Sequence, residues 1–287
     1  MTTGLIRFKT DVTSLALMLG VLPSAFAAEP KVETTKVFPI DGIETLDIRT
    51  GRGDILIKGT DRLTLKVELT KTEDMADCRV IAEPEAQTAA SPNPAPKAFR
   101  LEVKDRSKSS KGKCFLGLSV EIPERMDVRA VSGTGDIEAA ALAGDFSADG
   151  GAGEIRLKNL RGQVKVKTGA GSVTGEFSAE SGADIHTGIG AVTLTGLKGP
   201  VSVETGTGEV SLEYDAVPVA ESSATIKTGT ASAVVFLPEG AKIRTKFKSG
   251  MGHLTNDLGE TPDANFLLSM NSGTGSLIVN KIADAKK

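Results

Sequence analysis

Apolar and polar residues alternate along much of the chain. Leu63, Leu65, Val67 and Leu69, for example, are separated by single polar or charged residues. This alternation is typical of a strand that buries one face against a core. Short runs of the same pattern return as far as Ile282, so the sequence predicts an all-β fold.

A short phrase, Ser/Thr-Gly-x-Gly, recurs through these runs. Ala231 replaces the second glycine in one copy, and Gly150 replaces the hydroxyl residue in another. From the second copy onward, the first glycines are about 18 to 23 residues apart, and a nearly constant period of this size indicates a repeat architecture. The first glycines of the copies are Gly51, Gly133, Gly151, Gly169, Gly188, Gly206, Gly229, Gly250 and Gly273.

Each copy also carries two apolar positions. In the copy at Gly169 they are Val166, before the glycines, and Val173, after them. Because their separation is an odd number of residues, a continuous strand would point them to opposite faces. Both reach one core only if the chain turns between them, and glycine supplies the positive φ that such a corner needs. A second corner recurs as Leu-x-Gly, for example at Leu142 and Gly144.

Each repeat is therefore expected to form a strand, a glycine corner and a second strand. We predict a β-solenoid, a β-helix-like stack of these repeats over residues 132–282, with an N-terminal β capping region at residues 35–131. The hydroxyl residues before the glycines are expected to form a ladder along one edge. Rungs spaced by about 4.8 Å would make a rod about 40 Å long. The alternative is an antiparallel sandwich whose hairpins share one turn type.

The start of the chain resembles an export signal. Arg7 and Lys9 precede an apolar run at residues 12–21, and residues 25–27 match a small-x-small cleavage site. We expect a signal peptide at residues 1–27, a linker at 28–34 and a polar tail at 283–287. No later run is long enough for a transmembrane segment. The protein is therefore expected to be exported, to the periplasm, the cell surface or the medium.

The composition limits the classes of partner that we expect and the residue types that can form the core. The net charge of −3 gives no reason to expect nucleic acid. Aromatic residues make up only 4% of the chain, which predicts a thin aliphatic core.

The chain has two cysteines, Cys78 and Cys114. In an exported protein a single pair predicts a disulfide, although two free thiols are the alternative. The pair flanks a segment rich in proline and alanine, residues 82–97, which is expected to be an extended loop. A bridge would close the base of that loop.

Two stretches carry a family resemblance. The segments EIPERMDVRAVSGTGDI (residues 121–137) and LPEGAKIRTKFKSGMGHL (residues 237–254) both lead into a glycine corner. With the remaining copies, they resemble a bacterial family of exported proteins with β-strand repeats that carries the label "putative adhesin". The resemblance covers roughly residues 35–280. It implies a β-helical exported protein and supplies no catalytic residues.

The motifs do not support a nucleotide-binding site or a calcium-binding array. The glycine pairs lack the third glycine of a dinucleotide site and the Gly-Lys-Ser/Thr of a phosphate loop. A column of acidic residues after the second glycines is too interrupted for a calcium array and is expected to keep an exposed corner soluble. His186 and His253 are predicted to be surface residues. We therefore expect no cofactor and no metal.

One pair of carboxylates leaves an enzyme as an alternative hypothesis. Asp136 and Glu154 are expected one rung apart, about 4.8 Å, which suits a β-helical polysaccharide lyase or hydrolase. Sugar-binding sites, however, usually contain aromatic side chains on which a sugar ring packs, and Tyr214 alone is a weak candidate for this role. The leading hypothesis is a non-enzymatic module for adhesion or envelope interaction, whose partner is an envelope or extracellular polymer or protein. A structural periplasmic protein without a specific ligand is the third alternative.

Overall fold

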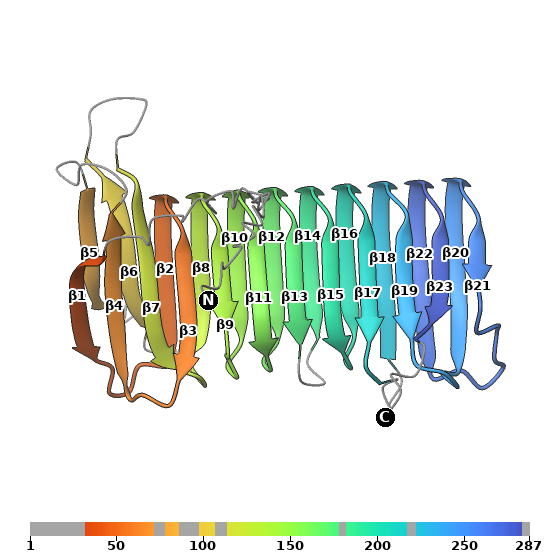
Figure 1. The fold of residues 1–287 in the computed structure, drawn as a ribbon, viewed down its shortest axis with the longest axis horizontal. Helices are drawn as coiled ribbons and strands as arrows, with labels where there is room; N and C mark the ends of the chain where they lie inside the picture. The colour runs from red at the N-terminus through yellow and green to blue at the C-terminus, as the bar shows by residue number, and fades with distance from the viewer. Residues whose placement is uncertain are drawn as a thin grey trace, which may run out of the picture.

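The computed structural model describes residues 32–71, 78–85, 98–106, 114–177, 182–216 and 222–282. The predicted signal peptide, most of the proline-rich insertion and the polar tail lie outside these residues. Within them the chain forms 23 strands in two long sheets that face each other (Figure 1). The fold is therefore all-β.

We call the 12-stranded sheet A and the 11-stranded sheet B. In spatial order, sheet A comprises β1 (Val32–Pro39), β4 (Thr64–Lys71), β7 (Leu116–Pro123), β3 (Ile55–Thr60), β9 (Ile137–Ala140), β11 (Ile155–Leu160), β13 (Val173–Phe177), β15 (Val192–Leu197), β17 (Val210–Tyr214), β19 (Ala233–Leu237), β23 (Leu277–Lys281) and β21 (Leu254–Asn256). Sheet B comprises β20 (Ile243–Met251), β22 (Phe266–Thr274), β18 (Ser222–Thr230), β16 (Val201–Thr207), β14 (Ala183–Ile189), β12 (Val164–Ala170), β10 (Phe146–Ala152), β8 (Asp127–Thr134), β2 (Thr45–Arg52), β6 (Ala98–Asp105) and β5 (Cys78–Pro84).

Each repeat forms one rung of a stack. A strand of sheet B runs to the glycine corner, and a strand of sheet A runs back from it (Figure 1). Neighbouring rungs pair in parallel and in register, as Ala148 with Val166 between β10 and β12. The two apolar columns both point inward, since Val166 and Val173 are fully buried. The β-solenoid prediction is confirmed, and the antiparallel sandwich is wrong.

The two glycine positions of a corner require glycine for different reasons. Gly190, a second glycine, has a φ of +155°, which a side chain rarely tolerates. Gly188, a first glycine, has no such φ, but a Cβ built there would lie 2.5 Å from the carbonyl oxygen of Gly169 in the neighbouring rung. At Gly188 the first glycine is therefore required by the close approach of the neighbouring rung. The first glycines of all the copies lie at the corner ends of the sheet B strands.

The hydroxyl residues before the glycines do form a column, but it is buried. Thr187 is 5% exposed, and its Oγ1 donates to the carbonyl of Gly171 at 3.3 Å. Oγ1 of Thr228 donates to Oγ of Ser272 on the adjacent rung at 2.8 Å. The hydroxyls of Thr187 and Thr228 thus donate to groups inside the corner, whereas those of Thr168 and Thr205 have no hydrogen-bond partner among the described residues.

The order of the rungs departs from the sequence at both ends. The final rung of the chain, β22 with β23, lies between β18–β19 and β20–β21. At the other end β6 and β7 stack outside β2 and β3. The outermost rung at each end is therefore not the one closest to the chain terminus.

The N-terminal region combines parallel rungs with antiparallel strands. β2 and β3 form a rung that pairs in parallel with β8 and β9, and β8 covers residues 127–134. Antiparallel strands β1, β4 and β5 close this end of the stack. β1 starts at Val32, inside the expected linker, and β5 includes Ala82 to Pro84, inside the expected loop.

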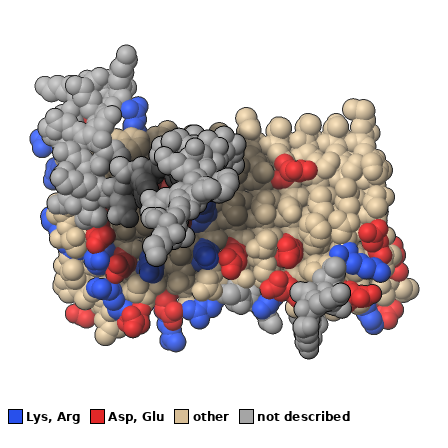
Figure 2. Space-filling view, viewed as in Figure 1, with Lys and Arg blue, Asp and Glu red and all other residues tan. Residues whose placement is uncertain are grey.

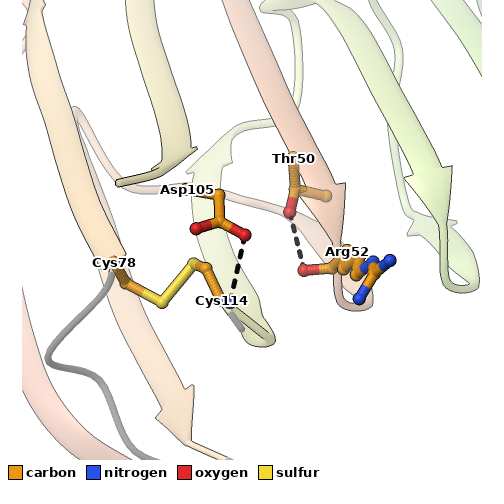
Figure 3. The surroundings of a disulfide bond; sticks show 5 residues. All are labelled: Thr50, Arg52, Cys78, Asp105 and Cys114. Carbon is orange, nitrogen blue, oxygen red and sulfur yellow. Dashed lines mark hydrogen bonds between the residues drawn. A yellow bond between two sulfur atoms is a disulfide. The ribbon is translucent and has the colours of Figure 1, made fainter. Parts of the chain in front are cut away.

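A disulfide joins Cys78 and Cys114, with Cα atoms 5.1 Å apart (Figure 3). Cys78 begins β5 in sheet B, and Cys114 shortly precedes β7 in sheet A. The backbone N–H of Cys114 donates to the Asp105 carboxylate at 3.4 Å. The β6–β7 rung has no Gly-x-Gly corner, and the disulfide lies at the end of this rung where most other rungs have one.

Candidate functional site

A groove of about 740 Å³ runs across the outer face of sheet B. Its lining comes from six neighbouring rungs, β10 to β18 and β22, each of which contributes one outward side chain in register. We call this row the polar ladder. Its members are Asp149, Lys167, His186, Glu204, Lys227 and Asn271.

Charges of both signs follow one another along the polar ladder, at the rung spacing of about 4.8 Å. His186 lies between two carboxylates, with Nε2 3.0 Å from Asp184 Oδ1 and Nδ1 3.6 Å from Glu204 Oε2. These side chains are between a third and about half exposed. The ladder is thus open to water and can contact a ligand without a change in the fold.

The glycine column forms the floor beside the ladder. Gly169, Gly188, Gly206 and Gly229 line the groove one rung after another. Because these positions have no side chain, a ligand in the groove can approach the backbone closely. Figure 2 shows that, on the face in view, the upper part of the later rungs carries almost no charged side chains.

The carboxylates proposed for catalysis are held in structural contacts. The Asp136 carboxylate accepts a hydrogen bond from the backbone N–H of Glu154 at 2.9 Å, and Asp54 does the same for Asp136. Arg156 bridges the pair, 2.9 Å from Asp136 and in closer contact with Glu154. The hydrogen bond to Asp136 is the main cause of a raised pKa at Arg156, which therefore stays a cation. An arginine in contact with both carboxylates does not give them the separate acid and base environments that hydrolysis requires.

This use of carboxylates was missed from the sequence. At the second corner the Asp127 carboxylate accepts from the N–H of Asp145, and Asp145 accepts from the N–H of Gln163. The signal was available, because these acceptors recur at the repeat spacing. The acidic column expected to aid solubility thus also satisfies backbone N–H groups of the next rung.

The remaining candidates are also structural or on the surface. His253 is exposed, and its Nδ1 lies 3.2 Å from Oγ of Ser276. Tyr214 is fully buried and packs edge-on against Phe266, so it offers no sugar platform. Burial raises the pKa of its hydroxyl, for which no described residue provides a hydrogen-bond partner. Among the described residues no cluster of His, Cys, Asp or Glu has the makings of a metal site.

The fold and groove define a parallel two-sheet β-solenoid with a polar outer groove. The chain belongs to the Toastrack DUF4097 family, whose model matches residues 43–276. No curated protein matches the chain. Within the described residues, no helix has the length and apolar character to cross a membrane.

Two solved structures are similar to this chain. One is a "putative adhesin" from Bacteroides fragilis, 15% identical, which covers 87% of this chain and 98% of its own, with a TM-score of 0.47. The other is a "putative cell adhesion protein" from Clostridium sporogenes, 14% identical, which covers 88% and 100%, with a TM-score of 0.34.

Proposed function

We propose that the protein is exported and acts without catalysis, as an adhesion or envelope interaction module that binds an extended polar polymer along the sheet B groove. The observation that carries this proposal is the polar ladder, which presents one ligand-accessible group from each of six successive rungs. A polymer lying along the stack meets a similar set of contacts at each step.

Repetition matters because single exposed charges bind weakly. An exposed ion pair contributes about 0–1 kcal/mol, so one rung cannot hold a ligand. Several rungs acting on one chain raise the overall affinity, since each further contact forms within the complex. The presence of both signs favours a polymer with hydroxyl, amide and charged groups over a uniformly charged one.

Export is supported by the disulfide between Cys78 and Cys114, since such bonds persist in oxidising compartments. Protease treatment of intact cells, with the chain followed by antibody, tests the location. Cleavage in intact cells supports display at the surface. Protection until the outer envelope is opened restricts the proposal to polymers inside the envelope.

The binding experiment is cosedimentation with isolated envelopes, and with wall polymer and surface polysaccharide purified from them. The test variant is Lys167→Ala with Glu204→Ala, in the polar ladder. The control is Lys158→Ala with Glu176→Ala, which removes the same exposed charges from the outer face of sheet A.

We expect only the ladder variant to lose binding. Equal loss in both variants would contradict a site on sheet B. An absence of binding by the native protein to every fraction would favour the structural role without a ligand. Release of soluble sugar from a fraction would revive the enzyme alternative.

A further inference from the structure

The C-terminal end of the stack is open, in contrast to the N-terminal end. β20 is the last strand of sheet B and pairs only with β22, and β21 is the last strand of sheet A. Inward positions that are buried in other rungs are partly exposed here. Leu254 is 39% exposed, whereas its in-register neighbour Leu277 is 0% exposed.

The chain covers only the first half of β20. The loop after β21 places Glu260 so that its carboxylate accepts from the backbone N–H of Thr245 at 3.0 Å. The N–H of Thr261 donates to the carbonyl of Ile243 at 3.0 Å. Burial alone would raise the pKa of Glu260, but the hydrogen bonds from Thr245 outweigh it and lower that pKa. The loop thus serves as a partial strand partner for residues 243–245.

Beyond Thr245 the open side of the strand continues without a partner among the described residues. Alternate residues of a strand direct their N–H and C=O groups to the same side. Since Ile243 and Thr245 use the open side, Phe247 and Ser249 present their backbone groups there as well. Phe247 also packs only partly against the core. An added strand would satisfy these groups and complete the burial of Phe247.

The charged side chains of the last three strands of sheet B are all cationic. The outward residues of β20 are Arg244, Lys246 and Lys248, and β18 adds Lys227 on the same face. None of the strands β18, β20 and β22 contains an aspartate or a glutamate. Lysines on an edge strand discourage pairing with a second copy, whose own lysines would face them. The same lysines favour a strand of opposite charge.

We infer that the free half of β20, residues 247–251, is a strand-addition site for an extended acidic segment of a partner protein, with carboxylates at alternate positions facing Lys246 and Lys248. Backbone hydrogen bonds to Phe247 and Ser249 would give the register, and apolar residues between the carboxylates would cover Phe247. Lys248 is in register with Asn271, the last member of the polar ladder, but the backbone site on β20 does not depend on the proposed polymer binding.

The probe is a short fluorescent peptide in which glutamate and valine alternate, titrated against the full chain, with a lysine–valine peptide as its counterpart. We expect only the glutamate peptide to bind, and Lys246→Glu with Lys248→Glu to weaken it about tenfold or more. The matched control is Lys58→Glu with Lys158→Glu. These exposed lysines lie on the outer face of sheet A, on β3 and β11, and each of these strands is paired on both sides.

Hydrogen exchange separates strand addition from simple charge attraction. The amides of Phe247 and Ser249 should exchange more slowly with the glutamate peptide bound. Equal loss of binding in both lysine variants, or no added protection at these amides, would overturn the inference. So would sedimentation of the peptide-free protein as a dimer that Lys246→Glu with Lys248→Glu abolishes, because a second copy would then be the occupant.

Discussion

Replacing the first glycine of a mid-stack corner tests whether rung spacing, and not backbone conformation, explains the repeated glycines. In Gly188→Ala the new Cβ would lie 2.5 Å from the carbonyl oxygen of Gly169. A carbon normally stays about 3.3 Å or more from such an oxygen, so the rungs would have to move apart by about 0.8 Å. Backbone hydrogen bonds fix β14 to strands on both sides, so that movement is resisted.

Overpacking of this kind costs about 1–3 kcal/mol, and each kcal/mol lowers the Tm of a chain this size by about 2–4 °C. We therefore expect Gly188→Ala to melt about 2–12 °C below the native protein, measured by circular dichroism with the disulfide intact. The structure supplies two controls. Gly51 begins the same phrase but has no atom within 4 Å of a built Cβ, and its φ is not left-handed. Gly240 has equal space but a φ of +81°.

These controls separate the causes. Gly51→Ala should be neutral or raise the Tm by about 1–3 °C, because alanine restricts the unfolded chain. Gly240→Ala should lose about 1–2 kcal/mol through backbone strain alone. If the Tm of Gly188→Ala equalled that of Gly51→Ala, the steric explanation of the first glycine would be refuted.

Three further changes have expected outcomes in the same melting assay. Tyr214→Phe should raise stability by about 1 kcal/mol, since it removes a buried hydroxyl without a described partner, and a lower Tm would show that the hydroxyl is satisfied. Ala141→Gly should raise the Tm by about 1–3 °C, because Ala141 has a φ of +58°, and an unchanged or lower Tm would count against strain there. Reduction of the disulfide between Cys78 and Cys114, which closes a 36-residue separation, should cost about 3–4 kcal/mol, and Cys78→Ser with Cys114→Ser should then melt like the reduced protein.

Much of the fold could be predicted because the repeat makes each local rule visible many times. One copy of Thr-Gly-x-Gly is weak evidence, but apolar positions in register around successive copies leave few ways to bury them all. The role of the first glycine could not be predicted, because a Cβ built at this position clashes with a neighbouring rung. Its backbone φ is not in the left-handed region, so conformational preference does not reveal the requirement. The second corner was only partly predicted. Ala141 and Asn159, which precede its leucines, have φ values of +58° and +53°. Asparagine adopts such values more readily than most residues, but alanine does not.

The ends of the stack were the least predictable part for a physical reason. In the middle every rung has the same neighbours, so sequence order and spatial order agree. At an end, two rungs can exchange places with little change in local pairing, and the outcome depends on which one tolerates exposure. β22 brings Phe266, Leu268 and Met270 to the interior, whereas β20 brings Ile243 and Phe247 with a threonine and a serine.

Placing β22 inside and β20 outside therefore buries the more apolar strand on both sides, and it leaves the cationic strand at the boundary with water. The polar ladder follows from the regular middle of the stack, where in-register pairing brings Lys167, His186 and Glu204 side by side from positions about 20 residues apart. The open edge of β20 follows from the exception at the end. A binding surface that repeats is thus readable from the period of a sequence. A surface that occurs once, at the end of the stack, depends instead on which rung is the more apolar and takes the position that is buried on both sides.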